Sequence, residues 1–150
     1  MLTGLANRKA FFDALEGRVC GAVLYCDLDR FKPVNDELGH RAGDELLRAV
    51  AGRMQSCVRI GDLVARVGGD EFAVLCTDVT PEQAFELAQR IRAAIVEPFH
   101  ITDTTTCIGI SIGVAHASPA DGQELLELAD RALYRAKVTR DSSICWPIDS

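Results

Sequence analysis

An almost unbroken apolar run covers residues 19–26 and ends at Asp27. A strand with one wet face alternates apolar and polar residues, whereas a continuous run of this kind is typical of a strand buried on both faces. A sheet that contains such a strand needs other elements packed on either side of it. The run therefore predicts a central strand in a sheet that helices cover.

The rest of the chain supplies those helices and further strands. Apolar residues recur at helical spacing in four segments, residues 7–16, 44–58, 81–97 and 123–138. Strand-like runs cover residues 63–67, 72–75 and 105–114, with a shorter one at 99–101. Gly68 and Gly69 join the first two runs and favour a tight hairpin, because glycine accepts positive φ. We expect one α/β domain over residues 1–150, with a mixed, largely antiparallel sheet flanked by helices.

Composition and charge narrow the class of function. The 150 residues are 48% hydrophobic and 25% charged, and the net charge of −6 argues against a surface built for nucleic acid. No run approaches the roughly 20 apolar residues of a membrane helix, and no signal-peptide pattern follows Met1. Six cysteines without a CxxC pair favour reduced thiols over disulfides or zinc. We expect a cytoplasmic domain with no nucleic-acid partner and no direct membrane insertion.

Carboxylates gather at two places in this pattern. Asp27 and Asp29 follow the buried run, and Asp70 and Glu71 stand at the glycine hairpin. A strand end beside a hairpin can bring carboxylates together around a cation, and Mg²⁺ takes one or two carboxylates with substrate phosphates and water. The same residue types are ordinary in turns, so the pattern by itself leaves a metal site and a plain turn both open.

The polar segment between residues 27 and 44 offers contacts for a nucleotide. Lys32 is a point charge suited to a phosphate. Asn35 combines a donor with acceptors and Asp44 accepts N–H groups, so the pair suits guanine better than adenine. Asp44 also begins the helix predicted over residues 44–58, and spacing alone favours its role as the N-cap of that helix. His40 gives no signal of its own.

Six segments in order match one family. Residues 68–72 read GGDEF, and residues 27–36 resemble the DxDxFKxxND segment of GGDEF domains. Further counterparts of the family's LTGLxNR opening, GH and GD pairs, SIGVA strand and ADxALYxAK helix lie at residues 2–8, 39–40, 43–44, 111–115 and 129–137. The chain resembles the GGDEF family of diguanylate cyclases over residues 2–137.

The resemblance implies a ferredoxin-like core related to class III nucleotidyl cyclases and polymerase palms. It implies that each domain binds one GTP with Mg²⁺, or with Mn²⁺ in its place, and that a homodimer condenses two GTP into cyclic di-GMP. Asp27, Asp70 and the carbonyl of Leu28 would then ligate the metal. Glu71 would lie beside the metals and the attacking 3′-hydroxyl.

The resemblance also implies the substrate contacts. Asn35 and Asp44 would contact guanine, and Lys32 and Lys137 would contact phosphates. Phe31 and Lys32 would offer backbone N–H groups to the triphosphate. The expected catalytic set is Asp27, Lys32, Asp70 and Glu71, and the further substrate contacts are His40, Gly68, Gly69 and Arg140.

A second site is implied upstream of the hairpin. Arg59 and Asp62 resemble the family's RxxD inhibitory site, which binds the product, and Arg90 falls where the family often supplies another arginine. An arginine can grip guanine bidentately and stack on the base. An Arg and an Asp three residues apart are otherwise a common surface ion pair of little energetic value. With the family spacing intact, the product site is the favoured interpretation.

The chain departs from the family at both ends. It begins inside the opening motif, so we expect it to be part of a longer signalling protein with sensor or effector domains. A membrane anchor elsewhere in that longer protein is compatible with this expectation. After Lys137 the usual KxxGRN is changed: Asp141 takes the usual Arg position, and Arg140 would have to substitute. The tail at residues 138–150 either packs as a last strand near residues 144–148 or leads onward.

Two other functions stay open beside the cyclase, and the altered residues after Lys137 support the first of them. One is a non-catalytic regulatory domain that binds GTP or cyclic di-GMP and controls a partner domain. The other is a purely structural dimerisation domain, which would leave so full a set of polar residues without a use. Mg²⁺-dependent GTP binding separates the first two functions from the third, and turnover separates the cyclase from the regulatory domain.

Overall fold

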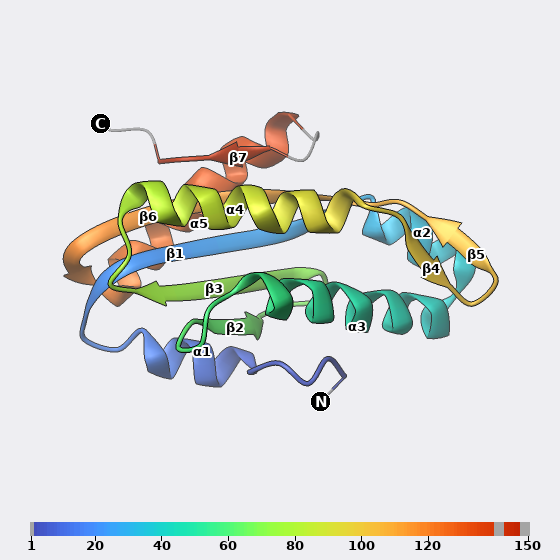
Figure 1. Ribbon diagram of the computed structural model, residues 1–150, viewed down its shortest axis with the longest axis horizontal. Helices are drawn as coiled ribbons and strands as arrows, with labels where there is room; N and C mark the ends of the chain where they lie inside the picture. The colour runs from blue at the N-terminus through green and yellow to red at the C-terminus, as the bar shows by residue number, and fades with distance from the viewer. Residues whose placement is uncertain (1, 140–142, 148–150) are drawn as a thin grey trace.

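A five-stranded sheet lies between two layers of helices in the computed structural model, which describes residues 2–139 and 143–147 (Figure 1). Its strands are β1 (Arg18–Asp29), β2 (Leu63–Arg66), β3 (Glu71–Thr77), β6 (Gly109–Asp121) and β7 (Ile144–Cys145). They lie in the order β2-β3-β1-β6-β7, and each neighbouring pair is antiparallel except β6 and β7. This confirms the predicted mixed, largely antiparallel sheet, with a last strand in the tail.

The central strand is β1, as the apolar run predicts. Leu24 and Cys26 are buried against the layer that contains α3 (His40–Cys57) and α4 (Pro81–Val96). Val23 is buried on the opposite face, against α1 (Arg8–Ala14) and α5 (Gly122–Thr139). Because successive strand residues point to opposite faces, both faces of β1 must be apolar to bury it.

Helix α5 lies directly on the sheet at one glycine. A Cβ added at Gly113 on β6 would lie 2.2 Å from the carbonyl oxygen of Ala129 and 2.2 Å from the nitrogen of Leu133. These are backbone atoms of α5, so only glycine lets the helix approach this closely. One turn beyond Leu133, the same helix brings Lys137 to the end of β1.

Two helical predictions were wrong at the segment after β1. Helix α2 (Phe31–Leu38) forms where a polar segment without helix was expected. Pro33 did not prevent it, because a proline in the first turn removes an N–H group that has no intrahelical partner. Helix α3 begins at His40 with Gly39 as its N-cap, so Asp44 lies inside the helix and is not its cap.

Two strand predictions also needed correction. The run at residues 105–114 divides into β5 (Thr104–Thr106), which pairs with β4 (Phe99–Ile101), and the start of the longer β6. The hairpin between β2 and β3 is confirmed, but neither Gly68 nor Gly69 adopts positive φ. The connection is longer than a two-residue turn, since Arg66 pairs with Phe72, and longer loops are commonly built without left-handed residues at each position.

All six cysteines are free thiols in this structure, with Cys26 and Cys76 buried as small apolar residues and Cys20 and Cys107 exposed. No helix in the described part of the chain is both long enough and apolar enough to cross a membrane.

Candidate active site and product-binding pocket

The end of β1 and the β2–β3 hairpin meet at one edge of the sheet. Asp27 lies directly opposite Glu71 in the antiparallel register of β1 and β3. The backbone N–H of Leu28 donates to the carbonyl of Asp70 at 3.1 Å. Strand pairing therefore brings Asp27 to Asp70 and Glu71, although it lies more than 40 positions before them in sequence.

Asp27 is the most unusual of these carboxylates, because its residue is only 5% exposed. Its Oδ2 accepts a hydrogen bond from Lys137 Nζ, whereas its Oδ1 is buried without a hydrogen-bond partner among the described residues. Burial raises the pKa of Asp27 to about 6, with the charges of Asp70 and Glu71 adding to the effect and Lys137 opposing it. The hydrogen bond to Asp27 in turn raises the pKa of Lys137.

The unpartnered oxygen fits a divalent cation. A buried carboxylate oxygen without a donor is costly, and a hard cation is a natural partner for it. The described residues contain no group of three or more His, Cys, Asp or Glu side chains that could hold a metal by themselves. Two carboxylates, a backbone carbonyl, and oxygens from substrate and water are nevertheless the usual ligands of Mg²⁺. Asp27, Asp70 and the carbonyl of Leu28 therefore suit Mg²⁺ better than a metal that needs a full protein cage.

The hairpin is held by two arginines: Arg8, from the LTGLxNR-like opening, and Arg66, which no sequence pattern singles out. The guanidinium of Arg66 donates to the carbonyls of Gly68 at 3.1 Å and of Gly69 at 3.1 and 2.8 Å. Arg8 Nη1 donates to the carbonyl of Val67 at 3.1 Å. These contacts fix the loop that carries Asp70, and only the structure could reveal them because they depend on side-chain direction.

Glu71 occupies space that the hairpin leaves open. A Cβ at Gly68 would lie 2.8 Å from Glu71 Oε1, whereas one at Gly69 would meet nothing within 4 Å. The Tyr25 hydroxyl approaches the same Oε1 at 3.4 Å, and burial, followed by the charge of Glu71, raises the pKa of Tyr25 to about 12. Tyr25 was missed from sequence, although strand periodicity puts it on the same face of β1 as Asp27. Gly68 thus makes room for a carboxylate and Gly69 leaves the turn accessible.

The predicted guanine residues lie on two adjacent helices. Asn35 is half-buried on α2, and Asp44 is exposed on α3. A Cβ added at Gly43 would lie 1.8 Å from Asn35 Oδ1, so the amide of Asn35 rests against the bare backbone next to Asp44. Lys32 and His40 are exposed in the first turns of α2 and α3, and Phe31 packs its ring on the core at the start of α2. Arg140 lies outside the described residues.

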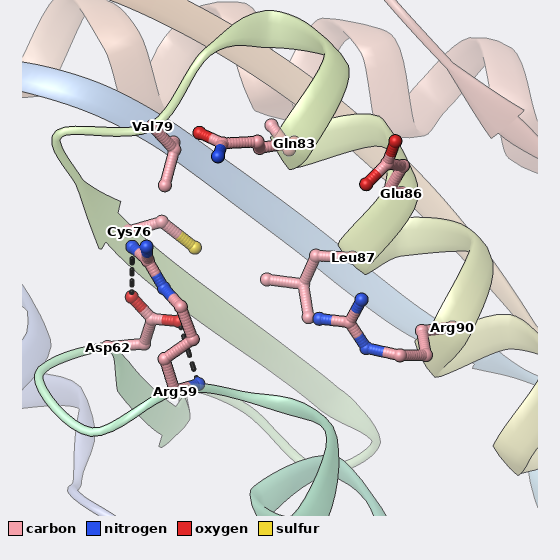
Figure 2. A pocket seen from close by; sticks show the side chains of 9 residues that line it. Arg59, Asp62, Cys76, Val79, Gln83, Glu86, Leu87 and Arg90 are labelled. Carbon is pink, nitrogen blue, oxygen red and sulfur yellow. Dashed lines mark hydrogen bonds and ion pairs between the residues drawn. The ribbon is translucent and has the colours of Figure 1, made fainter.

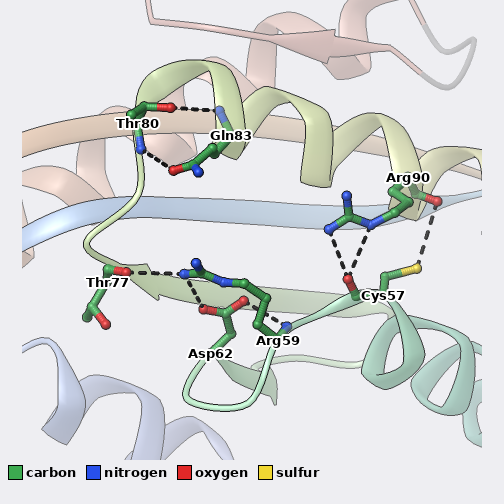
Figure 3. Close-up of polar contacts among 7 residues, drawn as sticks. All are labelled: Cys57, Arg59, Asp62, Thr77, Thr80, Gln83 and Arg90. Carbon is green, nitrogen blue, oxygen red and sulfur yellow. Dashed lines mark hydrogen bonds and ion pairs between the residues drawn. The ribbon is translucent and has the colours of Figure 1, made fainter.

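The second predicted site forms a pocket between the α3–β2 loop and α4 (Figure 2). Arg59 reaches it from the loop and Arg90 from the helix, with Leu87 between them. The Arg59 guanidinium lies 3.4 Å from Asp62 Oδ1 and 3.3 Å from the carbonyl of Thr77, and the Arg59 backbone N–H donates to Asp62 Oδ2 at 3.0 Å (Figure 3).

Both arginines of this pocket are held in place before any ligand arrives. Arg90 donates to the carbonyl of Cys57 through Nε at 3.3 Å and through Nη2 at 3.1 Å (Figure 3). The Asp62 side chain is only 3% exposed, whereas the side chain of its ion-pair partner Arg59 is 55% exposed. The pocket therefore presents two fixed guanidinium groups beside a buried carboxylate.

Comparisons with known proteins agree with this arrangement. The family model described as "Diguanylate cyclase, GGDEF domain" matches residues 1–143. The chain is 41% identical over 146 residues to Diguanylate cyclase DgcP of Pseudomonas aeruginosa, covering 91% of the chain but 22% of DgcP. The chain thus spans less than a quarter of that relative. Curated relatives include proteins named as diguanylate cyclases and proteins named as cyclic di-GMP phosphodiesterases.

Solved structures give the same result. The GGDEF domain of YfiN (TpbB) from Pseudomonas aeruginosa superposes with a TM-score of 0.88 at 36% identity, covering 99% of each chain. The GGDEF domain of DgcB from Caulobacter crescentus, in complex with cyclic di-GMP, superposes with a TM-score of 0.88 at 29% identity, covering 97% of this chain and 92% of that one. The fold expected from the sequence motifs is therefore confirmed, and the chain belongs to the GGDEF family.

Proposed function

We propose that this domain is a diguanylate cyclase that condenses two GTP into cyclic di-GMP and two pyrophosphates, with Mg²⁺ and across a homodimer. The observation that carries the proposal is the buried, unpartnered Oδ1 of Asp27, beside Asp70 and Glu71 and at the start of the helix pair that carries Asn35 and Asp44. Together these groups supply contacts for a metal ion, a triphosphate and a guanine base at one end of the sheet.

The metal ion and the triphosphate are bound by different residues. Asp27, Asp70 and the Leu28 carbonyl hold Mg²⁺, which when bound supplies positive charge for the triphosphate and lowers the pKa of a nearby hydroxyl. Lys137 partners Asp27 while no ligand is bound and moves its charge to a phosphate when GTP enters. Lys32 and the N–H groups of Phe31 and Lys32 bind the triphosphate at the start of α2, where helix geometry leaves donors free.

Base recognition and proton transfer belong to other residues. Asn35 and Asp44 contact the guanine edge, and His40 and the bare turn at Gly68 and Gly69 border the nucleotide. Glu71 accepts the proton of the 3′-hydroxyl. The hydroxyl oxygen then bonds to the α-phosphate of the other GTP, and pyrophosphate leaves.

A homodimer is required by the stoichiometry of the reaction. Each domain supplies one nucleotide site, and cyclic di-GMP contains two guanylates. Two domains facing one another place each 3′-hydroxyl at the α-phosphate of the partner's GTP. A weakly associating domain is therefore slow at low protein concentration.

Product inhibition is assigned to Arg59, Asp62 and Arg90. Their support is the pocket with two fixed guanidinium groups, together with the complex between cyclic di-GMP and the related DgcB domain. Guanine offers O6 and N7 to an arginine, and the Asp62 carboxylate suits an N–H donor.

A regulatory role is the second candidate. It is favoured by Asp141, which takes the usual Arg position of the family, and by relatives named as cyclic di-GMP phosphodiesterases. In that role the domain binds GTP or cyclic di-GMP and controls a sensor or effector domain of a longer protein.

Product formation decides between the two. Purified domain at high concentration is incubated with GTP and Mg²⁺, alone and fused to a dimerising coiled coil, and the nucleotides are separated by chromatography. Asp70→Ala should abolish cyclic di-GMP, whereas Asp103→Ala, an exposed carboxylate in the turn after β4, should not. If neither form of the wild type makes product, the regulatory role is the better assignment; an active Asp70→Ala would overturn the metal assignment.

A further inference from the structure

A buried serine at the start of the SIGVA-like segment contacts the end of β1, and none of the roles described above includes it. Ser111 on β6 has no exposed surface, and among the described residues only Asp27 is another buried polar residue. Ser111 Oγ lies 2.9 Å from Asp29 Oδ1 and 2.9 Å from Asp29 Oδ2. A serine hydroxyl carries one proton, and Ser111 donates it to the Asp29 carboxylate, whose two oxygens lie equally close. The contact fixes the orientation of the Asp29 carboxylate.

The register of the sheet explains why this contact forms. Ser111 lies directly opposite Asp27, and Asp29 is its diagonal neighbour on the same face of the sheet. Burying a hydroxyl is unfavourable unless it is hydrogen-bonded, so Asp29 is the partner that makes Ser111 acceptable at this position. The pair couples the last residue of β1 to the start of the neighbouring strand β6.

The residue after Asp29 has a strained backbone. Arg30 has φ of 67° and ψ of 15°, in the left-handed region that a residue with a Cβ rarely adopts. It is the N-cap of α2, but no side chain caps the helix. Such a conformation persists only where its surroundings hold it on both sides. Here Ser111 holds Asp29 on one side, and the packing of Phe31, Val34 and Leu38 on the core holds α2 on the other.

The direction of α2 depends on this turn. The first N–H groups of a helix have no intrahelical partners and point out along its axis. A small change in the Arg30 turn therefore redirects the donors of Phe31 and Lys32. Hydrogen bonds to charged groups are among the stronger ones, so donors that point away from the phosphates bind GTP more weakly.

We propose that Ser111 is a positioning residue for the triphosphate: its hydrogen bond to Asp29 fixes the left-handed turn at Arg30 and so directs the first N–H groups of α2 at the phosphates. This inference rests on the proposed function, because the phosphates are those of GTP. It adds a residue on β6 that touches neither substrate nor metal.

Nucleotide affinity tests the proposal directly. Titration calorimetry with Mg²⁺ and 3′-deoxy-GTP, which lacks the attacking hydroxyl and cannot react, should show affinity about tenfold weaker for Ser111→Ala than for the wild type. In steady state, the KM for GTP should rise about tenfold while kcat changes less than about threefold. The matched control is Ser56→Ala, an exposed serine on α3 whose Oγ donates to the carbonyl of Gly52.

Variants of Asp29 keep the test valid if Ser111→Ala folds poorly. Asp29→Ala removes the acceptor and should weaken binding at least as much as Ser111→Ala, whereas Asp29→Asn keeps an oxygen for the hydroxyl and should lose less. The double variant Ser111→Ala/Asp29→Ala should bind no more weakly than Asp29→Ala alone. Losses that add, or a Ser111→Ala that is less stable yet binds the analogue like the wild type, would overturn the proposal alone. A wild type that binds neither GTP nor the analogue would overturn the proposed function and this inference with it.

Discussion

Lys137 Nζ donates a hydrogen bond to Asp27 Oδ2, joining two residues 110 positions apart in sequence. The pair closes the active-site end of the sheet, because α5 lies on β6 and β1 lies beside β6. It satisfies only half of the Asp27 carboxylate, since Oδ1 stays buried without a partner. The domain thus keeps a partly uncompensated carboxylate in its interior, as expected of a site that is completed by a ligand.

Asp27→Asn should therefore stabilise the fold while it abolishes turnover. The pKa of Asp27, about 6 in the folded state against 3.8 in the unfolded chain, means that the folded state holds the proton more tightly. Stability is then full below pH 4 and is lost as pH rises to about 6, up to roughly 3 kcal/mol. Asparagine is never charged, so the variant should be more stable at pH 8 by roughly 1–3 kcal/mol, allowing for the lost ion pair with Lys137.

Urea unfolding at pH 8 and pH 5, without divalent cations, measures this difference. The gap between variant and wild type should shrink by about half at pH 5, where most wild-type Asp27 is protonated. Added Mg²⁺ should stabilise the wild type but not the variant. A variant that is less stable than the wild type at pH 8 would show that the Lys137 pair outweighs the burial of charge.

The sequence was informative where periodicity decides structure. The apolar run of β1 and the helical spacing of α4 and α5 depend only on which faces are buried, and each was predicted in the right order. Helix α2 was missed although Phe31, Val34 and Leu38 recur at helical spacing and pack on the core, because the segment is short, mostly polar and contains Pro33. The start of α3 was misplaced because Gly39, not Asp44, ends the preceding turn.

The candidate site divides in the same way. Motif order identified Asp27, Asp70 and Glu71, and strand pairing brings them together. The contacts of Arg66 and Tyr25, and of Ser111 with Asp29, follow from side-chain directions and register, which a single sequence does not specify. The sequence predicted positive φ at Gly68, whereas in the structure this glycine makes room for the Glu71 side chain without adopting positive φ.

Gly43→Ala should weaken GTP binding at least tenfold without unfolding the domain. The new Cβ would lie 1.8 Å from Asn35 Oδ1, so the amide must rotate away from its place against Gly43. Alanine is the better helix former, so α3 itself gains stability. Gly52→Ala on the same helix is the matched control, because its Cβ meets nothing within 4 Å. It should gain up to about 1 kcal/mol with GTP affinity unchanged. Equal affinity in both variants, by titration with 3′-deoxy-GTP, would remove Asn35 from the guanine site.

Arg59→Ala should relieve product inhibition and weaken cyclic di-GMP binding roughly ten- to hundredfold, the range expected for losing one bidentate arginine contact to guanine. Initial rates at rising cyclic di-GMP, together with direct titration of the product, measure the two effects. Arg131→Ala, an exposed arginine on α5 in the opposite helix layer, is the control. Inhibition that persists in Arg59→Ala at wild-type product concentrations would mean that the pocket in Figure 2 is not the inhibitory site.

Gly113→Ala should destabilise the domain more than Gly43→Ala or Gly52→Ala, which add the same methyl group elsewhere. The added Cβ would lie 2.2 Å from backbone atoms of Ala129 and Leu133, and backbone of a packed helix cannot yield as a flexible side chain can. Helix α5 must move away from the sheet, opening the core around Ala129 and drawing Lys137 away from Asp27. Overpacking of this kind costs roughly 1–3 kcal/mol and sometimes more, so urea unfolding should show a loss of at least about 2 kcal/mol. Gly52→Ala again serves as the control for the methyl group itself. If Gly113→Ala were as stable as the wild type, α5 would have to lie farther from β6 than described, and the placement of Lys137 at Asp27 would lose its structural basis.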